Sequence, residues 1–227
     1  MKVGTLVAVA LIGVTMAACT DSAPAPPEAT PVFWPTAGWR TTEPQSQGVD
    51  PAALAQLDHQ IDTTFTEVRS VLIVRHGHIV HERYRRGLSA GSGHDVRSVT
   101  KSFVATLVGI APGEGKILRL PTRELAKLGY LYLNGGRWEG TQVVPAEFVT
   151  AATTPTGLPP DVVTGYGLHW WIDDDGAGQR TFTAVGYGGQ YIAVVPDRDL
   201  VVVVTNNPEG PPDPGSLLTG TILPGVT

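Results

Sequence analysis

Cysteines, basic runs and long apolar runs are all scarce in this chain of 227 residues. Cys19 is the only cysteine, so no intrachain disulfide can form. Lysine and arginine together number 16 against 21 aspartates and glutamates, the net charge is -5, and no long basic run occurs. We therefore expect no nucleic-acid partner and no polybasic membrane patch.

The apolar run near the N-terminus is short for a membrane-spanning helix. It covers residues 3–16, follows Lys2, and gives way to small residues before Cys19. This order is typical of a secretory signal peptide. The letters "MAAC" also resemble the lipobox of bacterial lipoproteins, whose cysteine becomes the lipidated N-terminus, although Met16 stands where leucine is usual. Secretion without a lipid and an ordinary buried cysteine are the alternatives.

Three segments follow from this interpretation. Residues 1–18 are the expected signal peptide, and the protein is expected to be secreted and lipid-anchored on the extracytoplasmic face of a bacterial membrane. Residues 19–32 are rich in proline, alanine and serine, which predicts a disordered tether. Residues 33–227 are the expected folded domain, because 42% hydrophobic and 16% charged residues are a globular composition.

Hydrophobic spacing predicts the elements of this domain. Asp50 and Pro51 are typical of a helix start, and apolar residues recur at helical spacing over the next turns. Two β-rich runs around His76-Gly77 predict a hairpin. Further helices are expected over 98–110, over 122–134 and from Pro145. The strands expected after them cover 165–173, 181–196 and 200–207.

This order predicts an α/β (α+β) fold, in which an antiparallel sheet is flanked by helices. The N-terminal and C-terminal strands are expected to pair with one another. The run from Val201 to Val204 has no polar alternation, so its strand should be buried on both faces. We find no internal repeat.

Neither a metal nor a cofactor is expected. His76, His78 and His81 lie in the hairpin without a cysteine or carboxylate cluster to complete a zinc site, and we interpret them as solvated. The aspartates Asp173, Asp174 and Asp175 precede a glycine and are interpreted as a solvated turn rather than a calcium loop.

Ser98 and Lys101 are the candidate catalytic pair. Residues three apart share one face of a helix, so the lysine can reach the serine hydroxyl, which needs a base to become a nucleophile. Lys101 can act as a base only if burial or a nearby cation lowers its pKa. The pair alone fits a capped helix start equally well, with a lysine that extends to solvent.

Three segments of the sequence bear on whether Ser98 and Lys101 are catalytic. "SVTKSFVATLVGIAPGEGKI", "TRELAKLGYLYLNGGRWEGTQVVPAEFV" and "VGYGGQYIAVVPDRDLVVVVTN" resemble, in this order, the serine β-lactamase-like hydrolases. The resemblance is to the group of class C β-lactamases, D-Ala-D-Ala carboxypeptidases, esterases and aminohexanoate-dimer hydrolases. It implies a fold like that of β-lactamases and penicillin-binding proteins. It also implies a small-molecule or peptide-like substrate with an amide, ester or β-lactam bond, which is cleaved through an acyl-enzyme.

The resemblance also assigns roles to residues. It makes Ser98 the nucleophile and Lys101 its base. Tyr187-Gly188-Gly189 matches the family's Lys/His-x-Gly motif, with tyrosine in place of the commoner lysine or histidine. The backbone N–H groups of Ser98 and Gln190 would form the oxyanion hole.

The family's second motif, Tyr-x-Asn or Tyr-x-Ser, is missing together with the helical subdomain that carries it. Tyr132-Leu133-Asn134 matches the letters but belongs to the later helix, and we interpret Tyr132 as a core residue. The sequence therefore supports a serine hydrolase. The alternatives are a catalytically inactive lipoprotein that serves as a binding module, and an internally deleted, poorly active family member. The substrate and the oligomeric state stay open.

Overall fold

A computed structural model describes residues 32–108, 119–156, 165–174, 180–207 and 214–227. The signal peptide and tether therefore lie outside the described residues. No helix in the described ranges is both long and apolar enough to cross a membrane.

Within the described residues, eight strands form one sheet in the order β1-β3-β2-β12-β11-β10-β9-β8. Their bounds are Arg40–Thr41 for β1, Val68–Arg75 for β2, His78–Tyr84 for β3, Gly165–Tyr166 for β8, Trp171–Asp174 for β9, Arg180–Gly186 for β10, Gln190–Val195 for β11 and Leu200–Asn206 for β12. The pairing is antiparallel except between β1 and β3. The sheet is thus mixed rather than wholly antiparallel as expected.

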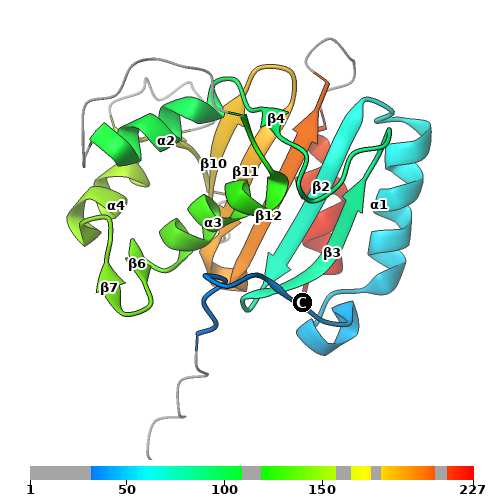
Figure 1. Ribbon diagram of the computed structural model, residues 1–227, viewed down its shortest axis with the longest axis horizontal. Coiled ribbons are helices and arrows are strands. Elements are labelled where there is room, and N and C mark those ends of the chain that lie inside the picture. The colour runs from blue at the N-terminus through cyan, green and yellow to red at the C-terminus, as the bar shows by residue number, and fades with distance from the viewer. Residues whose placement is uncertain (1–31, 109–118, 157–164, 175–179, 208–213) are drawn as a thin grey trace, which may run out of the picture. The chain divides into compact units, whose positions relative to one another are not determined.

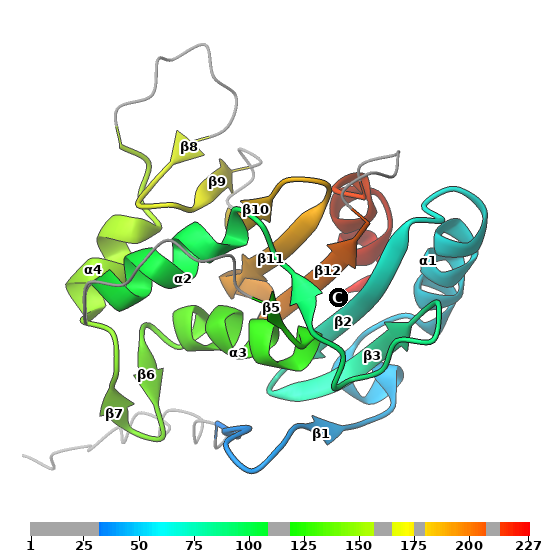
Figure 2. The same cartoon turned by 45° about the horizontal axis from the view of Figure 1, so that its top comes forward.

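Two layers of helix cover the sheet (Figures 1 and 2). On one face lie α2 (Val99–Val108), α3 (Thr122–Leu133) and α4 (Ala146–Ala152), and on the other lie α1 (Pro51–Thr63) and the C-terminal helical turns Leu218–Ile222 and Leu223–Gly225. The architecture confirms the predicted α+β fold.

Each face of the sheet has its own apolar core. The first cluster packs sheet residues such as Leu72 and Val203 against Leu125 of α3, and the second packs Ile73 and Val202 against Leu57 of α1. Every residue of β12 is buried, which confirms the prediction that this strand is buried on both faces.

The local signals at α1 and the hairpin are confirmed. The Asp50 carboxylate accepts a hydrogen bond of 2.8 Å from the Ala52 N–H, and Pro51 begins the helix. His76 and Gly77 form the tight turn between β2 and β3, both with positive φ. The predicted pairing of first and last strands is also confirmed, since β2 lies antiparallel to β12.

The hairpin histidines differ from the expectation in one case. His76 is exposed and contacts Gln47, and His78 contacts the His76 carbonyl. His81 is not solvated, because its side chain is only 14% exposed and its Nε2 lies 3.1 Å from the Asp58 carboxylate. Asp58 belongs to α1, so its contact with His81 forms only when the hairpin and α1 come together in the folded chain.

The connection after α2 is short. The helix ends at Val108, and β5 (Arg119–Leu120) pairs with β4 (His94–Asp95), just before α2. The ten residues between them, 109–118, lie outside the described residues. After α3, a small hairpin of β6 (Arg137–Trp138) and β7 (Thr141–Gln142) leads into α4.

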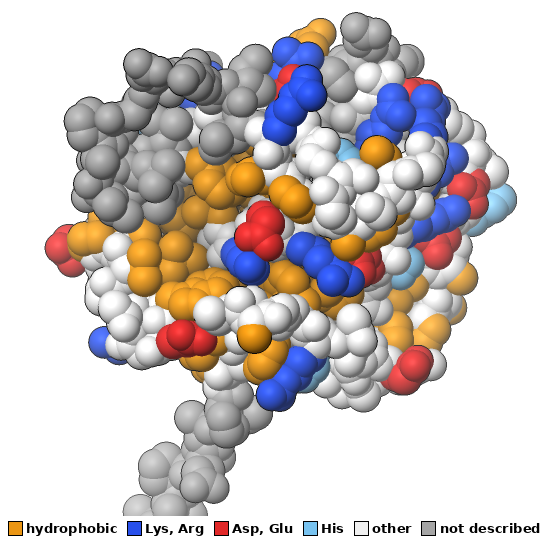
Figure 3. All heavy atoms as spheres, viewed as in Figure 1, with side chains coloured by type: hydrophobic (Ala, Val, Ile, Leu, Met, Phe, Trp, Pro, Cys, Tyr) orange, Lys and Arg blue, Asp and Glu red, His pale blue; other side chains and the backbone are white. Residues whose placement is uncertain are grey.

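The face of α3 and α4 is not fully covered. Figure 3 shows apolar side chains at the surface over these helices. Hydrophobic residues that pack on the first core but stay partly exposed include Phe103, Leu120, Leu131 and Phe148. This apolar surface is consistent with a family member that lacks a covering subdomain.

Candidate active site

Ser98 lies in the turn that starts α2. The N–H groups of Val99, Thr100 and Lys101 donate to the carbonyls three residues earlier, at 3.0, 3.0 and 2.9 Å. The preceding Arg97 has a left-handed φ of 49°, and its N–H donates to the Asp95 carboxylate. Ser98 is half-buried, at a helix end where free N–H groups and the helix dipole favour a developing negative charge.

Lys101 shares the first turn of α2 with Ser98, but its side chain is exposed. The expected burial is therefore not found: no described side chain covers this lysine. Among the described residues, no hydrogen bond joins the Ser98 hydroxyl to the Lys101 ammonium group. The side chains of Val104, Leu107 and Val108, which follow Lys101 in α2, lie outside the described side chains.

Tyr187, Gly188 and Gly189 form the turn between β10 and β11, closed by the pair Gly186 and Gln190. The strand predicted over 181–196 is thus two strands joined by this turn. Their φ angles are 79° and 83°, in the left-handed region that favours glycine. A Cβ at Gly189 would overlap Pro214, while Tyr187 is 73% exposed.

The Gln190 side chain is buried and holds this turn to the end of β12. Its Nε2 donates to the Asn206 carbonyl at 2.8 Å, and its Oε1 accepts from the Asn206 N–H at 3.1 Å. The Asn206 side chain in turn donates to the Gly188 carbonyl at 2.9 Å. The amide groups therefore fix the conformation of the glycine turn.

The structure brings the two halves of the predicted site together. A Cβ on Gly186 would lie only 2.5 Å from the Val96 carbonyl oxygen, so the end of β10 touches the turn that carries Ser98. Figures 1 and 2 both place the start of α2 beside this end of β10. Ser98 and the 187–190 turn are thus neighbours, although 89 residues of sequence separate Ser98 from Tyr187.

Tyr132 does not join this site. It is 2% exposed and lies in the first core, with its ring centroid 4.6 Å from that of Trp170 and 6.4 Å from that of Phe182. This placement agrees with the packing role expected for Tyr132. Apart from Tyr132, no tyrosine in the described part of the chain has the spacing Tyr-x-Asn or Tyr-x-Ser.

A polar cavity of about 250 Å³, which we call the His94 cavity, lies beside the Ser98 turn. Its polar lining residues are Arg69, His94, Asp95, Arg119, Asn206 and Asn207. Figure 3 shows basic side chains gathered at the upper edge of this face of the molecule. Sequence reasoning missed this cavity, because its walls come from four strands that are distant in sequence.

The buried histidines predict a loss of stability in weak acid. Burial, with the positive charge of Arg69, lowers the pKa of His94 below its ordinary value of 6.5. Burial also lowers the pKa of His81, against the opposing Asp58 carboxylate. Below pH 6.5 the unfolded chain therefore binds protons that the folded chain does not, and acid favours unfolding.

We expect the melting temperature to fall between about pH 6.5 and pH 5, above the range in which most carboxylates titrate. His94→Gln should reduce this dependence, whereas His59→Gln, a change on the solvent side of α1, should not. Melting curves that run parallel for the parent and His94→Gln would contradict this expectation.

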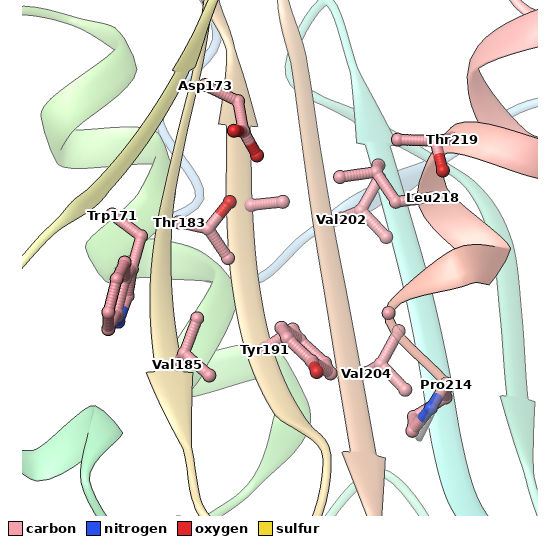
Figure 4. A pocket seen from close by; sticks show the side chains of 12 residues that line it. Trp171, Asp173, Thr183, Val185, Tyr191, Val202, Val204, Pro214, Leu218 and Thr219 are labelled. Carbon is pink, nitrogen blue, oxygen red and sulfur yellow. The ribbon is translucent and has the colours of Figure 1, made fainter. Parts of the chain in front are cut away.

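A second cavity, of about 290 Å³, is more apolar and lies on the opposite face of the sheet (Figure 4). Side chains of Val185, Tyr191, Val202 and Val204 line it, together with Leu218 of the C-terminal turn. Several of these belong to the second core, whereas Val96 and Val99, which flank Ser98, belong to the first. This cavity is therefore separated from Ser98 by the sheet.

The side chains of Trp170 and Trp171 lie on opposite faces of the sheet. Trp170 is fully buried in the first core. Trp171 is 42% exposed and lines the apolar cavity. Asp173 is exposed on β9 and lines the same cavity, while Asp175 lies outside the described residues. Within the described part of the chain, no three potential metal ligands form a cluster.

Sequence comparison identifies a family for the C-terminal half. Residues 115–223 match the protein family described as Beta-lactamase, a range that contains the 187–190 turn but begins after Ser98 and Lys101. A protein of Alkalihalophilus pseudofirmus, described as uncharacterised, is 31% identical over 113 residues, which are 44% of this chain and 33% of that protein. The chain thus spans about a third of the length of this curated relative.

Solved structures extend the likeness to most of the chain. The "putative 6-aminohexanoate-dimer hydrolase" of Bacillus anthracis has a TM-score of 0.63 at 13% identity, over 74% of this chain and 80% of its own. The "putative beta-lactamase" of Bacteroides dorei has a TM-score of 0.60 at 9% identity, over 77% and 99%. The octameric penicillin-binding protein homologue of Pyrococcus abyssi has a TM-score of 0.57 at 13% identity, over 78% and 77%.

These identities establish a common fold and nothing finer. Residues 115–223 thus match the Beta-lactamase family by sequence, and the described residues share the fold of β-lactamase-like and penicillin-binding-protein-like structures.

Proposed function

We propose that this protein is a serine hydrolase that cleaves amide, ester or β-lactam bonds through an acyl-enzyme on Ser98. The observation that carries the proposal is the close approach of the Ser98 turn to the end of β10, where Gly186 meets the Val96 carbonyl. This approach puts a serine at a helix N-terminus next to the glycine turn, of which Tyr187 is exposed. The family's fold supports hydrolysis in general.

In the proposed reaction the Ser98 oxygen attacks the substrate carbonyl carbon, and its proton passes to Lys101. The carbonyl oxygen becomes an oxyanion between the backbone N–H groups of Ser98 and Gln190. When the tetrahedral intermediate collapses, the bond to the leaving group breaks, Lys101 gives its proton to an amine leaving group, and an acyl-serine remains. Water then attacks the acyl carbon and gives a proton to Lys101; the bond to the Ser98 oxygen breaks, the acid is released, and Lys101 returns the proton to Ser98.

The absence of the family's tyrosine motif bears on the substrate. In the family that tyrosine takes part in proton transfer to the leaving group, and here Tyr132 is buried in the core. Leaving groups that depart as anions need no such proton. We therefore propose that activated esters are cleaved better than amides of similar shape.

A second candidate function is a binding module that keeps the scaffold without turnover. The exposure of Lys101 favours it, because within the described residues no hydrogen bond holds its side chain against the Ser98 hydroxyl. The apolar surface over α3 and α4 favours the related possibility of an internally deleted, poorly active member.

Labelling with a fluorophosphonate separates these candidates. We expect the parent protein to gain the mass of one adduct on Ser98, and Ser98→Ala and heat-unfolded protein to gain none. A protein that melts cooperatively but takes no label would contradict the hydrolase and support the binding module. A protein without a cooperative transition would support the deleted member.

We also propose that the chain is exported and lipidated at Cys19. Metabolic labelling with a fatty acid tests this: incorporation into the parent but not into Cys19→Ala supports the anchor. If neither protein incorporates the fatty acid, lipidation at Cys19 is contradicted and secretion without a lipid is the remaining interpretation.

A further inference from the structure

The His94 cavity carries positive charge that the described structure does not neutralise. Its one lining carboxylate, Asp95, already lies 3.4 Å from the Arg97 guanidinium. The nearby Glu67 accepts a hydrogen bond of 2.9 Å from the Asn207 side chain and forms an ion pair with Arg86.

Arg69 and Arg119 are the arginines that line the cavity. Within the described residues, neither Arg69 nor Arg119 has a carboxylate at ion-pair distance. They come from different elements, β2 and β5, and both face the same space. Guanidinium groups with free donors are well suited to hold carboxylate or phosphate oxygens.

A buried imidazole in the same wall lacks a partner. His94 is only 7% exposed, yet its Nε2 makes no hydrogen bond within the described residues. A buried polar atom left without a partner costs free energy, so such atoms in native proteins are usually satisfied by a ligand or water. His94 thus adds a polar residue to the wall of the cavity, but its Nε2 is closed to solvent.

Two residues that line the cavity also contact the candidate active site. Asp95 lines the cavity and accepts the Arg97 N–H, one residue before Ser98. Asn206 lines it too, and its side chain donates to the carbonyl of Gly188 in the glycine turn. A molecule with its carbonyl carbon at Ser98 could therefore extend a second group into the cavity.

We propose that the His94 cavity binds an oxyanion group, a carboxylate or a phosphate, carried by the molecule whose ester or amide bond Ser98 attacks. This inference rests on the proposed hydrolase function. Arg69 and Arg119 hold the oxyanion from two sides. The substrate is thus an acidic ester or amide, with its charge away from the bond that breaks.

Binding is tested without turnover. Inorganic phosphate and succinate are titrated against the full chain while the melting temperature and the heat of binding are recorded. We expect both anions to raise the melting temperature, and Arg69→Gln and Arg119→Gln each to weaken binding about tenfold, the loss of one charge-assisted hydrogen bond. Arg137→Gln, an exposed change on β6, is the matched control and should bind as the parent does.

Turnover identifies the source of the oxyanion. The p-nitrophenyl monoester of glutaric acid is compared with p-nitrophenyl butyrate. We expect kcat/KM to favour the acidic ester about tenfold. This preference should fall in Arg119→Gln and persist in Arg137→Gln, and inorganic phosphate should compete with the acidic ester.

The outcomes are distinct. Anion binding that depends on the arginines, without a preference for the acidic ester, would overturn the substrate assignment and identify a site for a free anion. Absence of anion binding in a parent that labels at Ser98 would overturn the inference and leave the hydrolase intact. Absence of labelling in a parent that binds anions would overturn the proposed function, and with it the substrate assignment, but not the oxyanion site.

Discussion

Ser98→Ala is expected to lower the turnover number on an activated ester by at least about 10³-fold, because loss of the nucleophile removes the covalent route altogether. Ser102→Ala is the matched control. The Ser102 hydroxyl is buried and donates to the His169 carbonyl at 2.7 Å, so its loss should lower the melting temperature while hydrolysis continues. Initial rates and melting curves on the same preparations report both effects.

A variant that combines Lys101→Met with Ser98→Ala tests whether Lys101 acts through Ser98. If serine and lysine act as one unit, Lys101→Met should cost about as much as Ser98→Ala, and the double variant should cost little more than either. Losses that multiply would show that Lys101 does not act through Ser98. Equal hydrolysis by the parent and Ser98→Ala would contradict the assignment of the nucleophile.

Trp170→Ala is expected to lower the free energy of unfolding by about 3–5 kcal/mol, the usual cost of emptying a large aromatic site in a core. The Trp170 ring is fully buried and packs against Tyr132 and edge-on against Phe182 at 5.3 Å. The preceding carbonyl, of His169, accepts the Ser102 hydroxyl, so the loss should also loosen the attachment of α2.

Trp170→Phe should cost much less than Trp170→Ala. Phenylalanine fills much of the site and removes an indole N–H that has no hydrogen-bond partner in the described part of the chain. Trp171→Ala, at a position 42% exposed, is the neighbouring control and should also cost less. Urea titrations measure all three, and equal losses for Trp170→Ala and Trp171→Ala would refute the packing argument.

Local signals account for what the sequence predicted well. Asp50 and Pro51 determine the start of α1 through contacts within a few residues, and His76-Gly77 determines a hairpin through its own backbone conformation. The apolar run of β12 is buried because it occupies an interior position of the sheet. The composition and the order of these elements were sufficient for the fold class.

Properties that depend on distant neighbours were not predicted. The exposure of Lys101 depends on what packs over α2, and the burial of His81 depends on Asp58 of another element. The parallel pairing of β1 with β3 involves two residues on each side, too few for a periodic pattern. The His94 cavity gathers residues from β2, β4, β5 and the end of β12, so no spacing along the chain indicates it.

The pairing of β2 with β12 also determines when the domain can fold. Ser70 and Thr205, hydrogen-bonded side chains on these strands, are separated by 135 residues of chain. β2 therefore cannot pair with β12 until β12 has been synthesised. Pairing between strands so far apart in the sequence is slow. A nascent chain that stops short of Leu200 presents β2 as an unpaired edge, so the incomplete product, rather than the finished domain, is the form most exposed to aggregation.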